Sequence, residues 1–240
     1  MRKEMQVPSG RIFTEDDLAL VSLMASCKFV DYREEPFMLR SGIESHVYVF
    51  GREDLTDNPH LEWQTGRKIA KVILEEHTKL GETDKTPCLV GIPVAGTALA
   101  QAASMVSFAE EMLAPSGRPI CHRIMRETLK EYGAHRKWVQ GDPSPEHVYW
   151  SVDNAVTDGR SKFVAAEKFA ESGYPSLEMP SLIFVDRQQG GVRRMKERGF
   201  QKIVVVFYLL DITFVLRERG VWPRGVIRSV EEEIQAHQFI

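Results

Sequence analysis

The segment from Tyr149 to Ser161, YWSVDNAVTDGRS, carries the side chains best suited to chemistry. We expect a hydrophobic strand to end at Asp153 and a short turn of small and polar residues to open a helix near Gly159. Backbone N–H groups of such a turn converge on one point, and the helix N-terminus adds partial positive charge, so the turn can hold a phosphate. The hydroxyls of Thr157 and Ser161 add donors, and Asp153 can accept hydrogen bonds from the hydroxyls of a ribose. From general rules alone, a turn with only a structural role is as compatible with this pattern as a binding site is.

Other catalytic signatures are missing from the sequence. No G-x-G-x-x-G motif follows an expected strand, and no G-x-S-x-G or H-E-x-x-H motif occurs. Gly91 and Gly96 have the spacing of a P-loop, but Thr97 and Ala98 follow in place of a lysine and a hydroxyl residue. The three cysteines have no C-x-x-C spacing and indicate reduced thiols rather than a zinc site. Dinucleotide-dependent redox, P-loop hydrolysis and esterase chemistry are therefore disfavoured.

The composition is that of a soluble globular protein. The 240 residues are 43% hydrophobic and 27% charged, which suffices for one large domain, or one domain with an appendage. With 31 Lys and Arg against 34 Asp and Glu, nucleic-acid binding through bulk charge is not expected. The N-terminus, MRKEMQVPSG, lacks the apolar run of a signal peptide. The longest apolar stretch, 203–210, is too short to span a membrane. We expect a cytoplasmic protein without a membrane partner.

Strand and helix patterns alternate along most of the chain, which predicts an α/β fold with a parallel sheet flanked by helices. Ahead of this alternation we expect a helix starting at Thr14, a hairpin over 37–50 and a helix over 60–80. The expected strands that follow are 88–92, 119–125, 147–152, 181–185 and 202–207. The expected helices are 97–113, 159–172, 192–198 and 211–219. We divide the chain into an N-terminal hood (1–60), an α/β core (61–220) and a C-terminal tail helix packed on the core (221–240). Ligands of such sheets bind beyond the carboxyl ends of the strands.

The connection over 126–146 is long for a compact domain. Segments of this length are usually functional flaps or disordered. It carries five basic side chains, Arg126, Lys130, His135, Arg136 and Lys137. A cationic flap beside a strand end suits an anionic substrate, although a solvated surface insertion is also compatible with the pattern.

Five segments together resemble the orotate phosphoribosyltransferases, a family of type I phosphoribosyltransferases. The turn at 149–161 resembles the signature for phosphoribosyl diphosphate (PRPP). The other four are FMLRSGIESHVYV (37–49), resembling the family's hairpin, VGIPVAGTALA (90–100), resembling its diphosphate loop, RETLKEYG (126–133), resembling its flap, and VDRQQGG (185–191), resembling its orotate-binding motif.

The resemblance implies a Rossmann-like type I fold and transfer of ribose 5-phosphate from PRPP to orotate N1 in pyrimidine synthesis, giving orotidine 5′-monophosphate and diphosphate. It assigns catalysis to Lys130 and Asp153. It places PRPP on Arg126, Lys130, Asp153, Asn154, Ala155, Val156, Thr157, Asp158, Gly159, Arg160 and Ser161. It places orotate on Arg40, Tyr48, Thr157 and Arg187. Mg²⁺ would bind through the PRPP diphosphate without direct side-chain ligands, and a homodimer would bring the 126–146 flap to the neighbouring site.

Several residues depart from the family pattern and keep two alternatives open. Asn154 replaces the second acid of the PRPP signature, and Glu127 and Tyr132 replace a basic residue and a histidine of the flap. Arg160 stands where a small residue is usual, and Arg40 where lysine is usual. The chain could therefore transfer ribose phosphate to another base, or be a catalytically degenerate regulator that binds PRPP or a nucleotide. The presence of Lys130 and Arg187 favours the enzyme, since a sensor needs neither a flap lysine nor an orotate clamp.

Overall fold

A parallel sheet of five strands forms the centre of the computed structural model, which describes residues 4–39, 42–49, 53–129 and 137–239. The strands are β5 (Thr86–Gly91), β6 (Cys121–Ile124), β7 (His147–Val156), β8 (Ser181–Asp186) and β9 (Ile203–Tyr208). Their order across the sheet is β6-β5-β7-β8-β9, and all neighbours are parallel. The predicted α/β class with a parallel sheet is confirmed.

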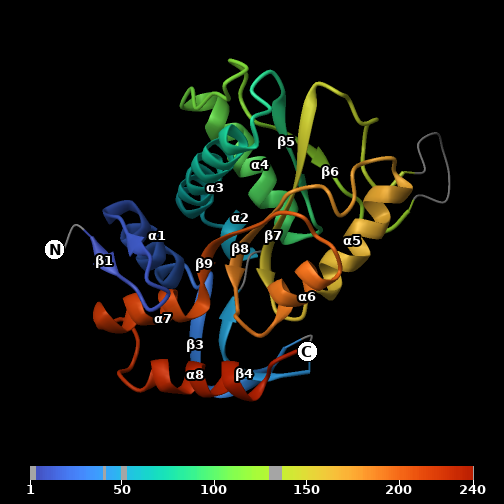
Figure 1. Cartoon of the computed structure of the whole chain (residues 1–240). Helices are drawn as coiled ribbons and strands as arrows, with labels where there is room; N and C mark the ends of the chain where they lie inside the picture. The colour runs from blue at the N-terminus through green and yellow to red at the C-terminus, as the bar shows by residue number, and fades with distance from the viewer. Residues whose placement is uncertain (1–3, 40–41, 50–52, 130–136, 240) are drawn as a thin grey trace.

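Helices cover both faces of this sheet (Figure 1). The pair α3 (Pro59–Leu80) and α4 (Ala95–Ala109) lies on one face, and α5 (Arg160–Glu171) and α6 (Gly191–Glu197) lie on the other. Side chains alternate between the faces along each strand. In β5, Leu89 packs in the same apolar cluster as Leu99 of α4, whereas Val90 packs with Phe169 of α5. Both faces are therefore buried, as a parallel sheet requires.

The N-terminal part adds two small antiparallel sheets and two helices. β1 (Met5–Gln6) pairs with β2 (Ile12–Phe13), and α1 (Glu15–Ser26) follows. Thr14 caps α1, and it forms a capping box with Asp17, as expected for a helix beginning there. The predicted hairpin is confirmed as β3 (Val30–Met38) paired with β4 (Glu44–Val49), although β3 begins earlier than expected. The short helix α2 (Glu53–Thr56) leads into α3.

The C-terminal part contains α7 (Leu209–Glu218) and α8 (Val226–Ala236). α8 packs against α7 and β4, with Val226 and Val230 buried. Near the opposite end of the sequence, the backbone N–H and hydroxyl of Ser9 donate to the carboxylate of Asp211 in α7 at 2.9 and 2.6 Å. Segments from both ends of the chain are thus fixed to the same helix.

The expected end of the strand at Asp153 is wrong. β7 continues to Val156, because Ala155 and Val156 pair with Val185 and Asp186 of β8. Asn154 therefore belongs to a strand rather than to the turn. The expected helix 97–113 also ends earlier, at Ala109.

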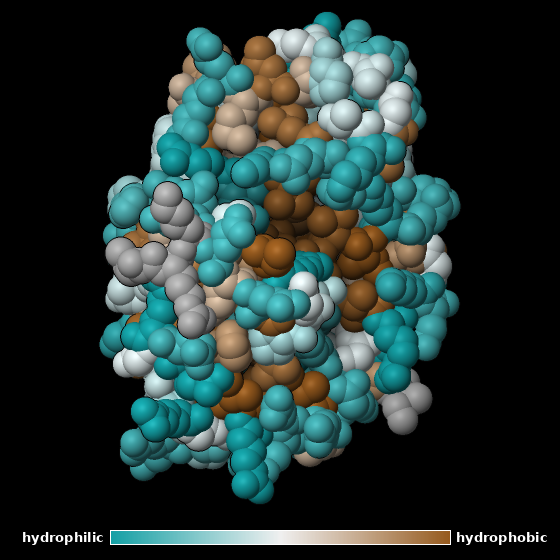
Figure 2. Space-filling view, turned by 60° about the vertical axis from the view of Figure 1, so that its left-hand side comes forward, coloured by the Kyte–Doolittle hydropathy of each residue, from teal (hydrophilic) through white to brown (hydrophobic). Residues whose placement is uncertain are grey.

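The surface is mixed in polarity. Figure 2 shows one face, on which apolar surface gathers in a hollow near the middle and hydrophilic side chains surround it. Among the helices that the structure describes, none is long and apolar enough to cross a membrane.

Candidate active site

A cavity of about 710 Å³ lies at the carboxyl ends of the central strands. Tyr48 reaches it from the hairpin, Ile92 from the loop after β5, and Met125 from directly after β6. Thr157 and Arg187 reach it from the segments that follow β7 and β8. The structure thus brings together residues from five segments that are far apart in the sequence.

The turn after β7 depends on Gly159, whose φ is +83°. Residues other than glycine rarely adopt this left-handed backbone conformation. A Cβ at this position would also lie 3.1 Å from Phe163 Cζ and 3.3 Å from the Gly191 carbonyl oxygen. Gly159 is the N-cap of α5, so the turn directs the N-terminus of that helix at the cavity. The predicted strand, tight turn and helix start are all present, and the binding of a phosphate there stays a prediction.

The charge of Arg160 in this turn is partly offset. Its Nε lies 3.0 Å from Asp158 Oδ2, and its backbone N–H donates to Asp158 Oδ1 at 3.1 Å. Arg194 of α6 also donates to the carbonyl oxygen of Asp158, at 2.9 Å. The pair of Asp158 and Arg160 therefore adds little net charge to the turn.

Asp153 is held by a lysine that the sequence analysis did not single out. Lys162 Nζ lies 2.6 Å from Asp153 Oδ2, and the two side chains are 4% and 9% exposed. Lys162 also donates to the carbonyl oxygen of Ala155 and, at 3.2 Å, to Ser161 Oγ. Lys162 and Asn154 line the cavity. The sequence signal that could have revealed this pair is an acid late in a strand, followed by a lysine in the first turn of the next helix.

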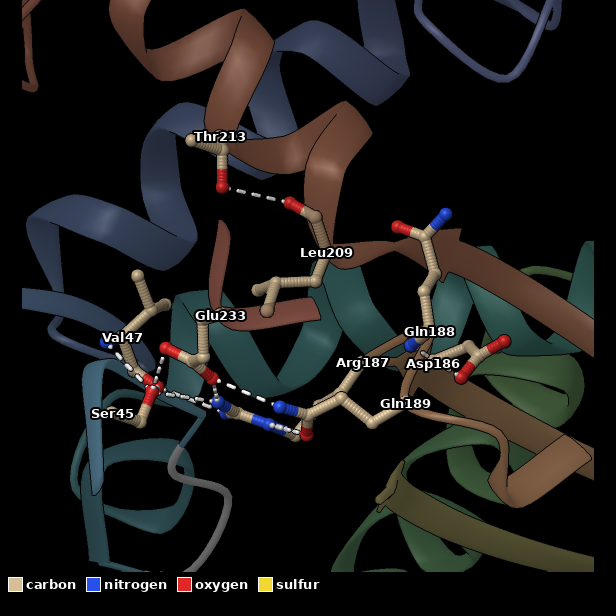
Figure 3. Close-up of polar contacts among 9 residues, drawn as sticks. All are labelled: Ser45, Val47, Asp186, Arg187, Gln188, Gln189, Leu209, Thr213 and Glu233. Carbon is tan, nitrogen blue, oxygen red and sulfur yellow. Dashed lines mark hydrogen bonds and ion pairs between the residues drawn. The ribbon is translucent and has the colours of Figure 1, made fainter. Parts of the chain in front are cut away.

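Arg187 lies at the centre of a buried polar network (Figure 3). Its side chain is 2% exposed. Nη1 donates to the Val47 carbonyl oxygen at 2.9 Å, and Nε donates to Gln189 Oε1 at 3.3 Å. Nη2 donates to Ser45 Oγ at 2.8 Å and to Glu233 Oε1 at 2.9 Å. Burial lowers the pKa of Arg187, and the charge of Glu233 opposes that shift. The expected orotate clamp therefore already has a carboxylate partner.

Asp186 precedes Arg187 and is also buried. Burial raises the pKa of Asp186 to about 6, against a hydrogen bond from the Gln188 backbone N–H that favours the ionised form. The folded protein therefore holds the proton of this carboxyl group more tightly than an ordinary aspartate in water holds its proton.

The described beginning of the long connection packs on α5. The backbone N–H of Arg126 donates to the Trp138 carbonyl oxygen at 2.7 Å. Lys168 Nζ lies 3.9 Å from the centre of the Trp138 ring and donates to the Glu127 carbonyl oxygen at 3.1 Å. The buried Nε of Arg126 has no hydrogen-bond partner among the parts of the chain that the structure describes.

The other predicted site residues divide into three groups. The side chain of Val156 is buried in the core, so this residue can contribute only through its backbone. Arg40, Lys130 and Tyr132 lie outside the described residues. The remaining predicted residues that line the cavity are Tyr48, Asn154, Ala155, Thr157, Asp158, Gly159, Arg160, Ser161 and Arg187. Within the described ranges, no cluster of three or more His, Cys, Asp or Glu side chains could hold a metal ion.

Comparisons with known proteins point to one family. No family model matches the chain. The chain is 27% identical over 189 residues to an orotate phosphoribosyltransferase of Synechocystis, an alignment that covers 78% of this chain and 85% of the relative. It is 25% identical over 186 residues to that of Sorangium cellulosum, covering 76% of this chain and 88% of the relative.

Solved structures agree on the fold. The UMP synthase of Leishmania donovani superposes with a TM-score of 0.70 at 19% identity, over 91% of this chain and 42% of that chain. The orotate phosphoribosyltransferase of Francisella tularensis superposes with a TM-score of 0.66 at 13% identity, over 92% of this chain and all of that one. The resemblance predicted from the sequence is confirmed: the chain has the type I phosphoribosyltransferase fold and is similar in sequence to orotate phosphoribosyltransferases.

Proposed function

We propose that this chain is an orotate phosphoribosyltransferase. The observation that carries the proposal is the composition of the cavity wall. All five segments that resemble the family's motifs contribute to it, represented by Tyr48, Ile92, Glu127, Thr157 and Arg187. Segments that serve only stability need not meet at one cavity, whereas the segments of a binding site must.

The turn at 157–161 would hold the 5-phosphate of PRPP. The start of α5 directs backbone N–H groups and the positive end of its dipole there, and the hydroxyls of Thr157 and Ser161 line the same space. Asn154 lines the cavity beside the turn and suits the ribose hydroxyls. Asp153 lies inside β7 and is paired with Lys162, so it would act on the ribose through Asn154, whose backbone N–H donates to Asp153 Oδ1 at 2.8 Å.

The residues fit a magnesium ion that arrives with the substrate rather than one held by the protein. The carboxylate of Asp158 on the cavity wall is paired with Arg160, and Asn154 is uncharged. Mg²⁺ on the diphosphate would neutralise charge on the leaving group.

The reaction would exchange one bond at C1 of the ribose. The C1–oxygen bond breaks and the diphosphate leaves with the electron pair, while N1 of orotate gives up its proton to the diphosphate or to water and forms the new bond at C1. Arg187 would hold the orotate carboxylate, with Tyr48, Arg40 and the hairpin backbone around the ring. Lys130 and Arg126 would stabilise the negative charge that develops on the diphosphate.

Two finer proposals follow from the family resemblance. We propose a homodimer in which the 126–146 flap of one protomer reaches the site of its partner, and we propose that the enzyme works in the cytoplasm. Sedimentation of the purified chain tests the first, and fractionation of the source cells tests the second.

The direct test follows the absorbance of orotate with the purified chain, PRPP and Mg²⁺. We expect magnesium-dependent loss of orotate, and we expect Lys130→Ala to reduce it about a hundredfold or more. Lys196→Ala, an exposed lysine of α6, is the matched control and should leave the rate unchanged. An absence of turnover while PRPP still binds by calorimetry would overturn the orotate assignment.

Transfer to another base remains the second candidate. The ion pair of Arg187 with Glu233 favours it, because it neutralises the cation that would select a carboxylated base. Turnover of a base without a carboxylate, in preference to orotate, would support this candidate.

A further inference from the structure

The partner of Arg187 comes from the C-terminal helix. Glu233 lies in α8, 46 residues further along the chain, and its side chain is 8% exposed. Oε1 accepts from Arg187 Nη2 at 2.9 Å and from Gln189 Nε2 at 3.1 Å, and Oε2 accepts from Ser45 Oγ at 2.8 Å. The carboxylate of Glu233 thus binds the guanidinium group of Arg187. This is the group that would bind the carboxylate of orotate in the proposed function.

The guanidinium has little capacity left for a second anion. Arg187 makes four hydrogen bonds within the protein, of at most five that an arginine side chain can donate. A second carboxylate would also stand beside Glu233 in a site that is shielded from water, where like charges repel strongly. Orotate and Glu233 therefore cannot both make a full ion pair with Arg187.

α8 is attached through a few buried apolar side chains and through the polar contacts of Glu233. Its buried residues are Val226 and Val230, and no side chain caps its N-terminus. Beyond the helix, the Phe239 backbone N–H donates to the Gln189 carbonyl oxygen at 2.9 Å, and Gln238 Nε2 donates to the Gln188 carbonyl oxygen at 2.9 Å. An element held by few buried apolar groups opens at a lower free-energy cost than the sheet does.

We propose that Glu233 is an internal competitor of the orotate carboxylate, so that α8 and the residues after it must withdraw from Arg187 before orotate can bind fully. The inference rests on the proposed function. It makes Glu233 a determinant of affinity for the carboxylated base. Because coupling between two ligands of one site is reciprocal, docking of α8 weakens orotate binding, and orotate loosens α8.

The test compares Glu233→Gln with the unchanged chain and with Glu231→Gln, an exposed carboxylate of the same helix. We expect Glu233→Gln to lower the KM and the calorimetric Kd for orotate about fivefold or more, with the KM for PRPP unchanged. Glu231→Gln should change neither constant. Thermal melts of all three proteins show whether the fold is retained.

Each other outcome has a definite meaning. A weaker affinity for orotate in Glu233→Gln would show that Glu233 positions Arg187 for the substrate, and equal affinities would show that the two carboxylates do not compete; either result overturns the inference. If the unchanged chain turns orotate over while the affinities stay equal, the proposed function survives alone. If neither protein binds orotate, both proposals fail.

A second measurement uses the unchanged chain and does not depend on turnover or on the variant. Amide hydrogen exchange over 226–239 should become faster with saturating orotate and stay the same with uracil, which lacks the carboxylate. Exchange that orotate slows or leaves unaltered contradicts displacement of α8.

Discussion

Lys162 and Asp153 form a buried ion pair, with Nζ 2.6 Å from Oδ2, within the segment that resembles the PRPP signature. The pair joins the first turn of α5 to β7, so the helix that would receive the phosphate is tied to the strand whose Asn154 would contact the ribose. The two halves of the proposed PRPP site cannot shift independently.

We expect Lys162→Met to lower the free energy of unfolding by about 3–5 kcal/mol, because it leaves the buried carboxylate of Asp153 without a cation, with only the Asn154 backbone N–H still donating to it. The double variant Asp153→Asn/Lys162→Met should recover most of this loss, since no uncompensated charge remains. Urea denaturation measures both. Lys196→Met, at an exposed position of α6, serves as the control. A double variant as unstable as Lys162→Met would show that the lysine acts through packing instead.

Asn154→Asp should raise kcat/KM for PRPP about fivefold. A charged acceptor binds a hydroxyl roughly 1 kcal/mol more strongly than a neutral amide does, and the position lines the cavity. Initial rates at varied PRPP measure the effect, and Asn154→Ala should lower the same constant. A decrease on introducing the acid would mean that Asn154 does not face the ribose.

Asp186→Asn should stabilise the protein at neutral pH and not at acidic pH. Burial raises the pKa of Asp186 to about 6 from an ordinary value of 3.8, so the folded state binds this proton more tightly than the unfolded state does. Ionisation therefore costs stability, and the cost grows as the pH rises from about 4 to about 6 and is complete above that. The amide removes a cost of at most about 3 kcal/mol.

Melting temperatures of Asp186→Asn and the unchanged chain, compared between pH 4 and pH 8, test this dependence. The gain should be largest at pH 8 and vanish near pH 4. Asp84→Asn, at an exposed position, should show no such trend. A gain that does not vary with pH would rule out ionisation of Asp186 as its source.

Gly159→Ala should cost about 1–2 kcal/mol of stability and raise the KM for PRPP. Alanine is strained at a φ of +83°, and its Cβ would press against Phe163 and the Gly191 carbonyl oxygen. Gly10→Ala is the matched control, because its φ is +85° and a Cβ there meets nothing within 4 Å. Gly10→Ala should lower the stability of the protein and leave the KM for PRPP unchanged. If both variants raise the KM for PRPP equally, Gly159 has no particular role in binding the phosphate.

The fold was largely predictable because its signals are local. The capping residues at Thr14 and the alternation of apolar strands with helical patterns determine where elements begin and how they pack. The end of β7 was mispredicted because pairing with β8, and not the polarity of Asp153 and Asn154, decides how far the strand runs.

The sequence predicted the motifs that form the site, but not the side chains that pair with the site residues. The turn at Gly159 and the strand-end position of Arg187 follow from short patterns, and both lie at the cavity as expected. The pairing of Arg187 with Glu233 joins residues 46 positions apart on different elements, and no periodicity relates them. The roles of Arg40 and Lys130 stay predictions, since both lie outside the described residues.

The hydrogen bonds from Ser9 to Asp211 join residues 202 positions apart. Asp211 is 1% exposed, so Ser9 contributes to a buried group that is synthesised 202 residues later. Contacts of such long sequence separation form late and slow the folding of a domain. Newly made chains should therefore expose the partly assembled sheet until α7 is complete, and this protein should depend on protection from aggregation during that interval.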